Sequence, residues 1–261
     1  FQQADAFTTD ARVLLLLGVA EHFQGLLVDG GHPGRGTVNW EMTQWRGLLS
    51  AAAAFPEVAG AAKVAEASMA YLTAFLQSGV YADGVETEMA SGYDMGTASD
   101  YFSSLKLNKQ AGLPDPPAAY VNRVEAMYTY GAYISDPSGY MPMNGDSDLH
   151  GNGYDRETAS YFKRPDWSYV HTNGAEGTAP KGPAPSSMFP WAGQCALRSG
   201  WNKNASWLWF DVGPFGSNPF HASAAITRSR RGSWESVSTR KDPLGTASKE
   251  PTSSIRRRWN R

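Results

Sequence analysis

The sequence predicts a mainly α-helical protein with an antiparallel β part toward its C-terminal side. Three observations support this prediction. Residues 11–134 contain long segments with apolar residues at helical spacing. Two short runs rich in aromatic and apolar residues flank GWNKN at residues 200–204, a turn-like segment, which is typical of a β-hairpin. Helices therefore come first and strands last, which favours two segregated parts over a βαβ sheet.

The first half is a series of helices with short connections. Asp10 is a plausible N-cap for the first helix, which is expected to end near Gly30 and Gly31. The expected helices cover residues 11–27, 38–55, 57–77, 95–110 and 118–134. Successive antiparallel helix pairs of this kind build bundles or α/α toroids.

Composition divides the chain into four segments. Residues 1–135 are the helical part, 136–187 a loop-rich connection, 188–221 the strand-forming part, and 222–261 a basic tail rich in Ser and Thr. A hairpin as apolar as the one predicted here needs more strands to bury it. The tail has almost no aliphatic periodicity, so we do not expect it to supply them.

Charge also separates the tail from the body. Residues 222–261 hold ten basic and three acidic residues, whereas the rest of the chain holds thirteen basic and twenty-two acidic ones. One interpretation is a disordered tail that binds nucleic acid or acidic surfaces. We favour a frame-shifted or truncated reading of the gene, because the pattern is lost abruptly after His221, and we expect no nucleic-acid partner.

Several classes of protein are excluded by composition. At 41% hydrophobic, the chain can form a core, but its longest apolar run, Val13 to Ala20, is too short to cross a bilayer. The single cysteine, Cys195, rules out an internal disulfide and a cysteine-based zinc site. The chain starts with Phe1 and shows no signal peptide, so either a leader was removed or the sequence is a fragment.

The stretch DGVETEMASGYD at residues 83–94 is the most informative candidate site. It places Asp83, Glu86 and Glu88 before Tyr93, at the start of an expected helix. A capped loop with a packed ring would explain it, and so would a tyrosine that transfers protons. No dinucleotide-binding, P-loop, HExxH or GxSxG motif occurs, and the five histidines are never at metal-ligand spacing.

Five motifs in order resemble the heparinase II/III-like polysaccharide lyases, which include alginate and heparan-sulfate lyases. They are VNWEMTQWRGLLSAAAAFPE, VYADGVETEMASGYD, GYMPMNGDSD, FPWAGQCALRSGW and WLWFDVGPFGSNPFH. The resemblance runs from about Ala11 to His221. It implies an incomplete α/α toroid followed by the start of an antiparallel β-sandwich, with an active site between them, in a chain that is an internal fragment of such a protein.

The resemblance implies β-elimination on a uronate-containing polysaccharide. A base removes the C5 proton, an acid protonates the leaving O4, and hydrogen bonds or a cation must offset the charge of the neighbouring carboxylate. No water is consumed, and the product carries a C4=C5 double bond. The implied partner is an acidic polysaccharide, and the implied location is the periplasm, the cell envelope or the medium. No oligomeric state is indicated.

The resemblance assigns three catalytic candidates. Asn39 matches the carboxylate-binding Asn, although a helix N-cap would explain it equally well. Tyr93 matches the catalytic tyrosine, whose phenol has an ordinary pKa of about 10 and suits the acid that protonates O4. His221 matches a histidine that serves as base or neutralises the carboxylate. Ala222 to Ala225 replace the His and Asp that follow it in metal-binding members, so we expect no metal and no other cofactor.

Three further residues are candidates for substrate binding. Trp40 stands where some members have a His, and it could stack on a sugar. Glu88 is expected to hold its loop by accepting hydrogen bonds, with a solvated carboxylate as the alternative. Arg198 could meet a carboxylate, although a structural salt bridge is favoured. Stacking on sugars and packing in a sandwich core are both open for three more tryptophans, Trp201, Trp207 and Trp209.

Two other functions remain open. One is a glycoside hydrolase on an α/α scaffold, using paired carboxylates such as Asp83, Glu86 or Glu88. The other is a fragment that binds sugar without turnover. Among uronate polymers, we expect a less charged one such as alginate, because the body of the chain is net acidic. An acidic surface does not attract the highly negative heparin-like chains.

Overall fold

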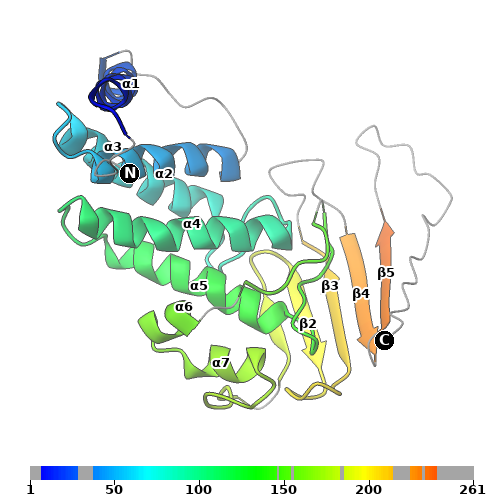
Figure 1. Cartoon of the computed structure of the whole chain (residues 1–261). Coiled ribbons are helices and arrows are strands. Elements are labelled where there is room, and N and C mark those ends of the chain that lie inside the picture. The colour runs from blue at the N-terminus through cyan, green and yellow to red at the C-terminus, as the bar shows by residue number, and fades with distance from the viewer. Residues whose placement is uncertain are drawn as a thin grey trace. The chain divides into compact units, whose positions relative to one another are not determined.

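The structure is a computed structural model that describes residues 7–28, 38–145, 147–153, 156–182, 185–213, 224–230 and 233–239. Its helices are α1 (Thr9–Val28), α2 (Val38–Ala54), α3 (Ala61–Gly79), α4 (Ser91–Gln110), α5 (Ala118–Ile134), α6 (Arg156–Tyr161) and α7 (Pro165–His171). Its strands are β1 (Ser187–Phe189), β2 (Gln194–Arg198), β3 (Trp207–Asp211), β4 (Ala224–Arg230) and β5 (Ser233–Thr239) (Figure 1). Helices followed by antiparallel strands, as predicted, are therefore confirmed.

The five long helices match the predicted ones, but the start of α1 differs. Thr8, and not Asp10, provides the cap, because the Thr8 hydroxyl oxygen accepts a hydrogen bond from the Ala11 amide at 3.2 Å. Asp10 lies inside the first turn, where its charge interacts favourably with the helix dipole. The short helices α6 and α7 lie in the stretch predicted to be loop-rich. Pro165 at the first position of α7 was the local signal for the second of them.

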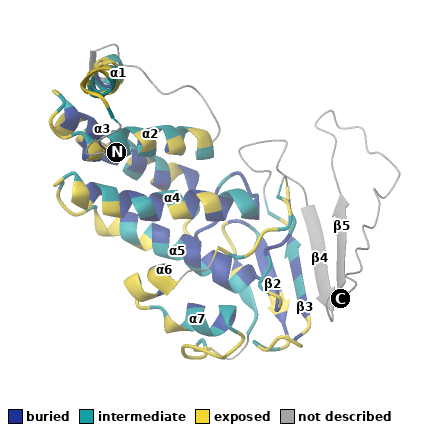
Figure 2. Cartoon of the chain, viewed as in Figure 1, coloured by how far each residue is buried: buried dark blue, intermediate teal, exposed yellow. Residues whose placement is uncertain are grey.

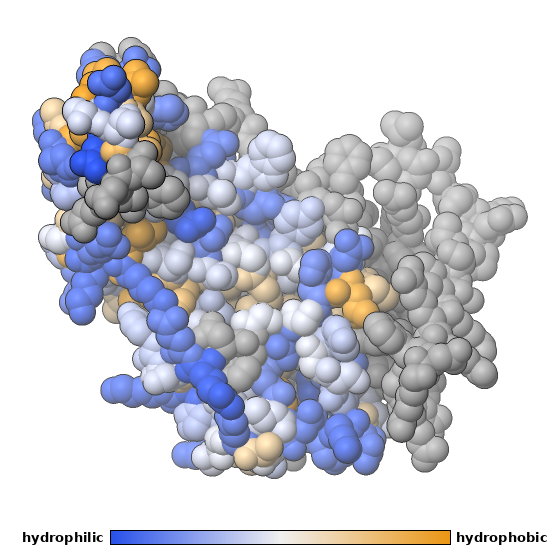
Figure 3. Space-filling model, in the orientation of Figure 1, coloured by the Kyte–Doolittle hydropathy of each residue, from blue (hydrophilic) through white to orange (hydrophobic). Residues whose placement is uncertain are grey.

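The chain forms two compact units. The first contains residues up to Gln77 together with Ser99–Tyr120, and the second contains Ser78–Ala98 and everything from Val121 onward. In the first unit the Trp45 ring stacks on Tyr71, with ring centroids 4.4 Å apart. Apolar residues also lie exposed on α1, where Leu14 and Leu17 are 69% and 55% accessible (Figure 3).

In the second unit the strands form one antiparallel sheet in the order β1-β2-β3-β4-β5. The predicted hairpin is confirmed, with β2 and β3 in register from Gln194 opposite Asp211 to Arg198 opposite Trp207. On one face, alternate residues of β2 and β3 are buried (Figure 2). This face packs against α5, where the Tyr130 ring meets Phe189 edge to face at 4.9 Å.

A series of side-chain hydrogen bonds connects α5 to β2 and β3 within this buried contact. The Tyr130 hydroxyl donates to Gln194 Oε1 at 2.8 Å, and Gln194 Nε2 donates to Asp211 Oδ2 at 3.1 Å. Asp211 Oδ1 in turn accepts the Gly213 amide at 2.8 Å, and burial raises the pKa of Asp211 to about 6. These bonds fix α5, β2 and β3 to one another, because breaking any of them would leave a buried polar group unpaired.

Part of the predicted tail has strand structure. Strands β4 and β5 cover 224–230 and 233–239, and β4 pairs with β3 from Ile226 opposite Phe210 to Ser229 opposite Trp207. This differs from the expectation that the tail supplies no further strands, because a free strand edge such as that of β3 can pair with a backbone whatever its side-chain pattern. The frame-shift interpretation stays a prediction, and residues 240–261 lie outside the described part. Among the described helices, none is long and apolar enough to cross a membrane.

Candidate active site

Tyr93 is the third residue of α4 and is partly exposed. The prediction that this tyrosine stands at a helix start behind an acidic loop is therefore confirmed. The helix begins at Ser91 because the loop before it turns sharply. Met89 has a left-handed backbone with a φ of 61°, which is unfavourable for a residue with a side chain. The surroundings must therefore hold this junction in place.

The acidic loop is a tight turn. Val80 and Glu86 form an isolated antiparallel bridge, and the Tyr81 amide donates to the Val85 carbonyl at 2.8 Å. Gly84 has a φ of +93°, and an added Cβ there would lie 2.2 Å from the Ala126 carbonyl oxygen, so only glycine fits. This turn directs the carboxylates of Glu86 and Glu88 inward.

Glu86, Glu88 and Asp94 are buried, at 0%, 0% and 1% exposure. The alternative of a solvated Glu88 is therefore wrong. A side chain without exposed surface cannot touch a substrate in this conformation, which favours the predicted role of Glu88 in holding the loop. The prediction of Glu88 as a substrate-binding residue has no support from its position.

Glu86 and Asp94 are two buried carboxyl groups that affect each other. The Glu86 amide donates to Asp94 Oδ2 at 3.1 Å, and Thr97 Oγ1 donates to Glu86 Oε2 at 3.4 Å. Burial, followed by the charges of Asp94 and Glu88, raises the pKa of Glu86 well above its ordinary value. Burial also raises the pKa of Asp94, but its amide donor and its place in the first turn of α4 favour its charge. We therefore assign a proton to Glu86 and the charge to Asp94.

A second loop, residues 140–151, clamps the start of α4. Tyr140 and Gly151 close this loop by an antiparallel bridge. The fully buried Asn144 reaches from it to both sides of the strained junction: its Nδ2 donates to the Met89 carbonyl at 2.5 Å, and its Oδ1 accepts the Ser91 amide at 3.1 Å. One side chain thus satisfies groups of the acidic loop and of the helix.

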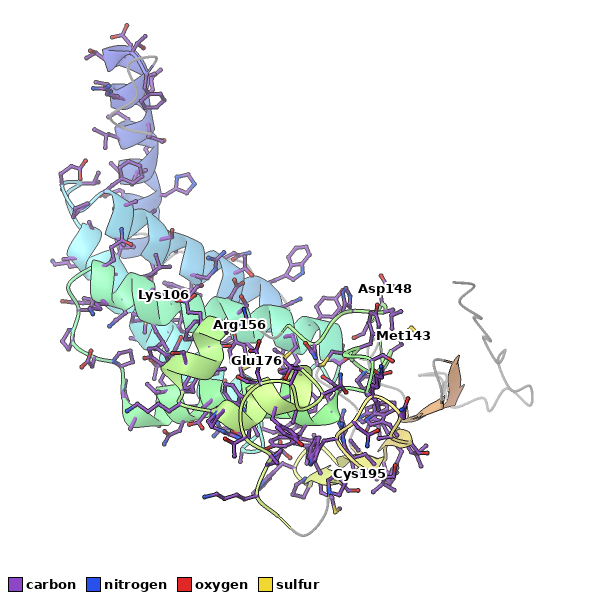
Figure 4. The ribbon with its side chains drawn as sticks, turned by 60° about the horizontal axis from the view of Figure 1, so that its bottom comes forward. Lys106, Met143, Asp148, Arg156, Glu176 and Cys195 are labelled. Carbon is purple, nitrogen blue, oxygen red and sulfur yellow. The ribbon has the colours of Figure 1, made fainter. Side chains whose placement is uncertain are left out.

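Two more contacts complete this clamp. Ser147 Oγ accepts the Gly92 amide at 2.9 Å, and Ser91 Oγ donates to the Pro142 carbonyl at 2.5 Å. The exposed His150 ring lies against Gly92, where an added Cβ would be 2.7 Å from His150 Cδ2. The amides of Ser91 and Gly92 have no partner within the helix, and the clamp bonds both of them. Tyr93 is the next residue. Labels at Met143 and Asp148 mark the loop in Figure 4.

Asn39 and Trp40 lie on α2, in the first unit. Asn39 is the second described residue of this helix and is partly buried, and the residues before Val38 lie outside the described part, so the alternative that Asn39 caps the helix stays open. Trp40 is 66% exposed, which leaves its ring accessible to a ligand. The predicted roles of both residues in binding substrate stay predictions.

Arg198 is buried and bonded to the protein backbone. It is 8% exposed, and its Nη2 donates to the carbonyls of Tyr133 at 2.7 Å and Ser135 at 2.5 Å. Its guanidinium also lies over the Trp201 ring, 4.6 Å from the centroid. Arg198 thus ties β2 to the C-terminal end of α5 and to Ser135, which follows it. These contacts with backbone carbonyls and an indole support the favoured structural role, and the predicted role in binding a carboxylate stays a prediction.

The other predicted residues divide between the core and the undescribed part. Trp207 and Trp209 are 1% and 0% exposed, so both belong to the core and neither is placed to stack on a sugar. Trp201 is partly exposed and contacts Arg198 and Tyr133. His221 lies outside the described residues. Within the described ranges, no group of three His, Cys, Asp or Glu side chains could hold a metal ion.

Comparison with known proteins decides the family. The family model described as Heparinase II/III N-terminus matches residues 1–166, which is more than half of the chain. This chain belongs to the heparinase II/III family.

The chain is also similar to individual heparinase relatives. A heparin-sulfate lyase of Pedobacter heparinus is 28% identical over 180 residues, covering 67% of this chain and 27% of that protein. The crystal structure of a heparinase III matches with a TM-score of 0.77 and 21% identity, covering 90% of this chain and 39% of the other. The heparan sulfate lyase structure from Pedobacter heparinus matches with a TM-score of 0.67 and 24% identity, over 88% and 37%.

These matches confirm the predicted fold class. The mainly α part and the antiparallel β part are shared with the solved heparinase structures, and the chain spans 27–39% of the length of these relatives. The clamp residues Asn144 and Ser147 were not among the predicted site residues. Their signal was present, because both lie in the segment 139–148 that includes the motif GYMPMNGDSD. Sequence reasoning recognised this motif for its resemblance but assigned it no function.

We expect substitution of Glu86 by Gln to change how stability depends on pH. Folding raises the pKa of the Glu86 carboxyl, so this group stabilises the folded protein at a pH below the pKa that it has in the unfolded chain. That stabilisation is lost as the pH rises through the pKa that it has in the folded protein. Gln mimics the protonated form at every pH. The melting temperature of Glu86→Gln minus that of the unaltered protein should therefore increase from pH 5 to pH 8. A constant or shrinking difference would contradict the assignment of the proton to Glu86.

We expect substitution of Asn144 by Ala to destabilise the protein by about 2 to 4 kcal/mol, because it leaves two buried backbone groups unpaired. Urea unfolding measures this change. Asn202 is the matched control: its exposed side chain accepts the Asn204 amide at 3.0 Å and bonds no buried group, so Asn202→Ala should cost less than about 1 kcal/mol. Equal effects of the two substitutions would show that Asn144 does not hold the start of α4.

Proposed function

We propose that this protein cleaves a uronate-containing polysaccharide by β-elimination, with Tyr93 transferring a proton. The observation that carries the proposal is the position of Tyr93, partly exposed on the first turn of α4 and held there by the acidic loop and the clamp. The similarity to a heparin-sulfate lyase supports the reaction class. A tyrosine with a fixed backbone and an accessible ring is suited to act on a bound polymer.

In the proposed reaction a base removes the proton from C5 of the uronate. The electron pair left behind forms the C4=C5 double bond, the C4–O4 bond breaks, and O4 takes a proton from an acid. We assign proton transfer to Tyr93, hydrogen bonding of the uronate carboxylate to Asn39, and a second proton-transfer or neutralising role to His221. The scheme uses no metal ion, as expected from the residues after His221.

The hydrolase alternative loses its candidate residues. An inverting or retaining glycosidase needs two carboxyl groups that face the glycosidic bond. Glu86 and Glu88 have no exposed surface, and Asp83 Oδ2 accepts the amides of Trp191 and Ala192 at 2.8 and 3.2 Å. The three carboxylates that suggested a hydrolase therefore support the protein structure.

Two substrates are proposed for the first assays. Heparan sulfate is favoured by the similarity to a heparin-sulfate lyase and a heparan sulfate lyase. Alginate is favoured by the net acidic body of the chain, which disfavours a heavily sulfated polymer. We also propose that the protein works outside the cytoplasm, in the periplasm, in the cell envelope or in the medium, where polysaccharides too large to enter the cell are met.

We expect the Tyr93→Phe variant to lose at least about 100-fold in activity, because a general acid or base contributes about 10²- to 10⁴-fold. The assay follows the ultraviolet absorbance of the unsaturated product on heparan sulfate, alginate, hyaluronan and pectin. Tyr161→Phe is the control, because Tyr161 is 52% exposed on α6 and has no proposed role. It should retain activity within about twofold.

Activity of Tyr93→Phe within threefold of the unaltered protein would contradict the role of Tyr93. If the folded chain binds a polymer but forms no product, the alternative of a non-catalytic binding fragment is favoured. Both outcomes are interpreted only for variants whose melting temperatures match that of the unaltered chain.

A further inference from the structure

We propose that Trp191 is a stacking platform for one pyranose ring of the polysaccharide. This inference rests on the proposed function, since it names a binding subsite for the same polymer. Two of the tryptophans that the sequence offered for stacking, Trp207 and Trp209, are in the core, whereas Trp191, which the sequence did not single out, is 64% exposed. Burial of tryptophan is normally favourable, so an exposed ring on a rigid turn is available for a ligand.

Trp191 lies in the four-residue connection between β1 and β2. Its neighbour Ala192 is fully buried, and the next residue, Gly193, has a φ of +68°. An added Cβ at Gly193 would lie 2.3 Å from the Cα of Gly213, so the connection is packed directly against the backbone after β3. The turn therefore has one buried side and one exposed side, and the indole is on the exposed side.

Asp83 holds this turn to the acidic loop. Its Oδ2 accepts the amide of Trp191 at 2.8 Å and that of Ala192 at 3.2 Å. Two hydrogen bonds to one carboxylate oxygen fix the backbone on both sides of the Trp191 Cα, and charge-assisted bonds are stronger than neutral ones. A ring whose backbone is already fixed loses less conformational entropy when a ligand covers it.

The same loop connects Trp191 to Tyr93. The loop that carries Asp83 continues through Glu86, whose amide is bonded to Asp94 on the first turn of α4. The exposed indole and the candidate catalytic tyrosine are thus attached to the two ends of one loop within the second unit.

The chemistry of the surroundings favours a sugar face over a charged group. The loop beneath Trp191 carries Asp83, Glu86 and Glu88, so a cation that could hold a uronate or sulfate is absent from it. A neutral indole adds affinity without charge, because its flat apolar face covers the C–H groups of a pyranose ring while the hydroxyls and carboxylate stay in water. This suits an acidic polymer bound beside an acidic loop.

The test compares four full-length proteins: the unaltered chain, Trp191→Ala, Trp191→Phe and Met188→Ala. Met188 is the matched control, because it is an apolar residue 74% exposed on the adjacent β1. Affinity electrophoresis through gels containing heparan sulfate or alginate gives the apparent Kd, and the ultraviolet assay gives KM and kcat on the same polymers. Size-exclusion chromatography and melting temperatures are recorded for each protein.

We expect Trp191→Ala to raise the apparent Kd and KM by about five- to tenfold, with kcat changed by less than about twofold, since stacking of one ring contributes on this scale. Trp191→Phe should recover most of the affinity, and Met188→Ala should bind like the unaltered chain. Binding by Trp191→Ala within twofold of the unaltered chain would overturn the proposal. An equal loss in Met188→Ala, or an altered oligomeric state in Trp191→Ala, would also overturn it.

The two readouts separate this proposal from the proposed function. If the unaltered chain binds a polymer and releases no unsaturated product, the lyase proposal fails, while the Kd comparison still decides the role of Trp191. If the unaltered chain binds neither polymer, the substrate class and the stacking platform are both overturned.

Discussion

The side-chain amide of Asn144 is the interaction on which the candidate site depends. Between the acidic loop and α4 the chain must pass through Met89 in a left-handed backbone conformation, which costs on the order of 1 kcal/mol or more. The Asn144 side chain donates to the Met89 carbonyl and accepts the Ser91 amide, so it bonds the chain on both sides of this junction. The junction is strained, buried and satisfied by one distant residue, and Tyr93 follows it by two positions along the helix.

Burial of acidic groups is the second constraint, and it explains why the loop has this shape. Glu86 and Asp94 would repel each other if both were charged in a buried site, so one of them keeps a proton. Asp83 is stabilised differently, by two backbone amides of the turn that carries Trp191. The acidic stretch that first suggested a catalytic cluster is therefore chiefly a scaffold. It fixes α4 at one end and the β1–β2 turn at the other.

The sequence predicted the helices, the β2–β3 hairpin and the place of Tyr93, because each depends on local pattern. It could not predict which carboxylates face inward, since Gly84 and the Ala126 carbonyl that forces the turn are far apart in sequence. The sequence also could not show which tryptophans are buried and which are exposed, because Trp191 and Trp209 both lie in aromatic-rich segments. Asn144 contacts residues 53 and 55 positions away, and no local pattern reports such a contact. The strand structure of 224–230 was missed because pairing with β3 is a backbone property.

The most direct test of the central claim, that Tyr93 stands in a site for β-elimination, is the fate of solvent oxygen. The folded chain is incubated with the polymer it binds in water enriched in ¹⁸O, and the products are analysed by mass spectrometry and proton NMR. Elimination consumes no water, so the account predicts products without the label and with a vinylic proton at C4 of the new non-reducing end. Incorporation of ¹⁸O at the cleaved bond, without a vinylic proton, would show hydrolysis and contradict the account.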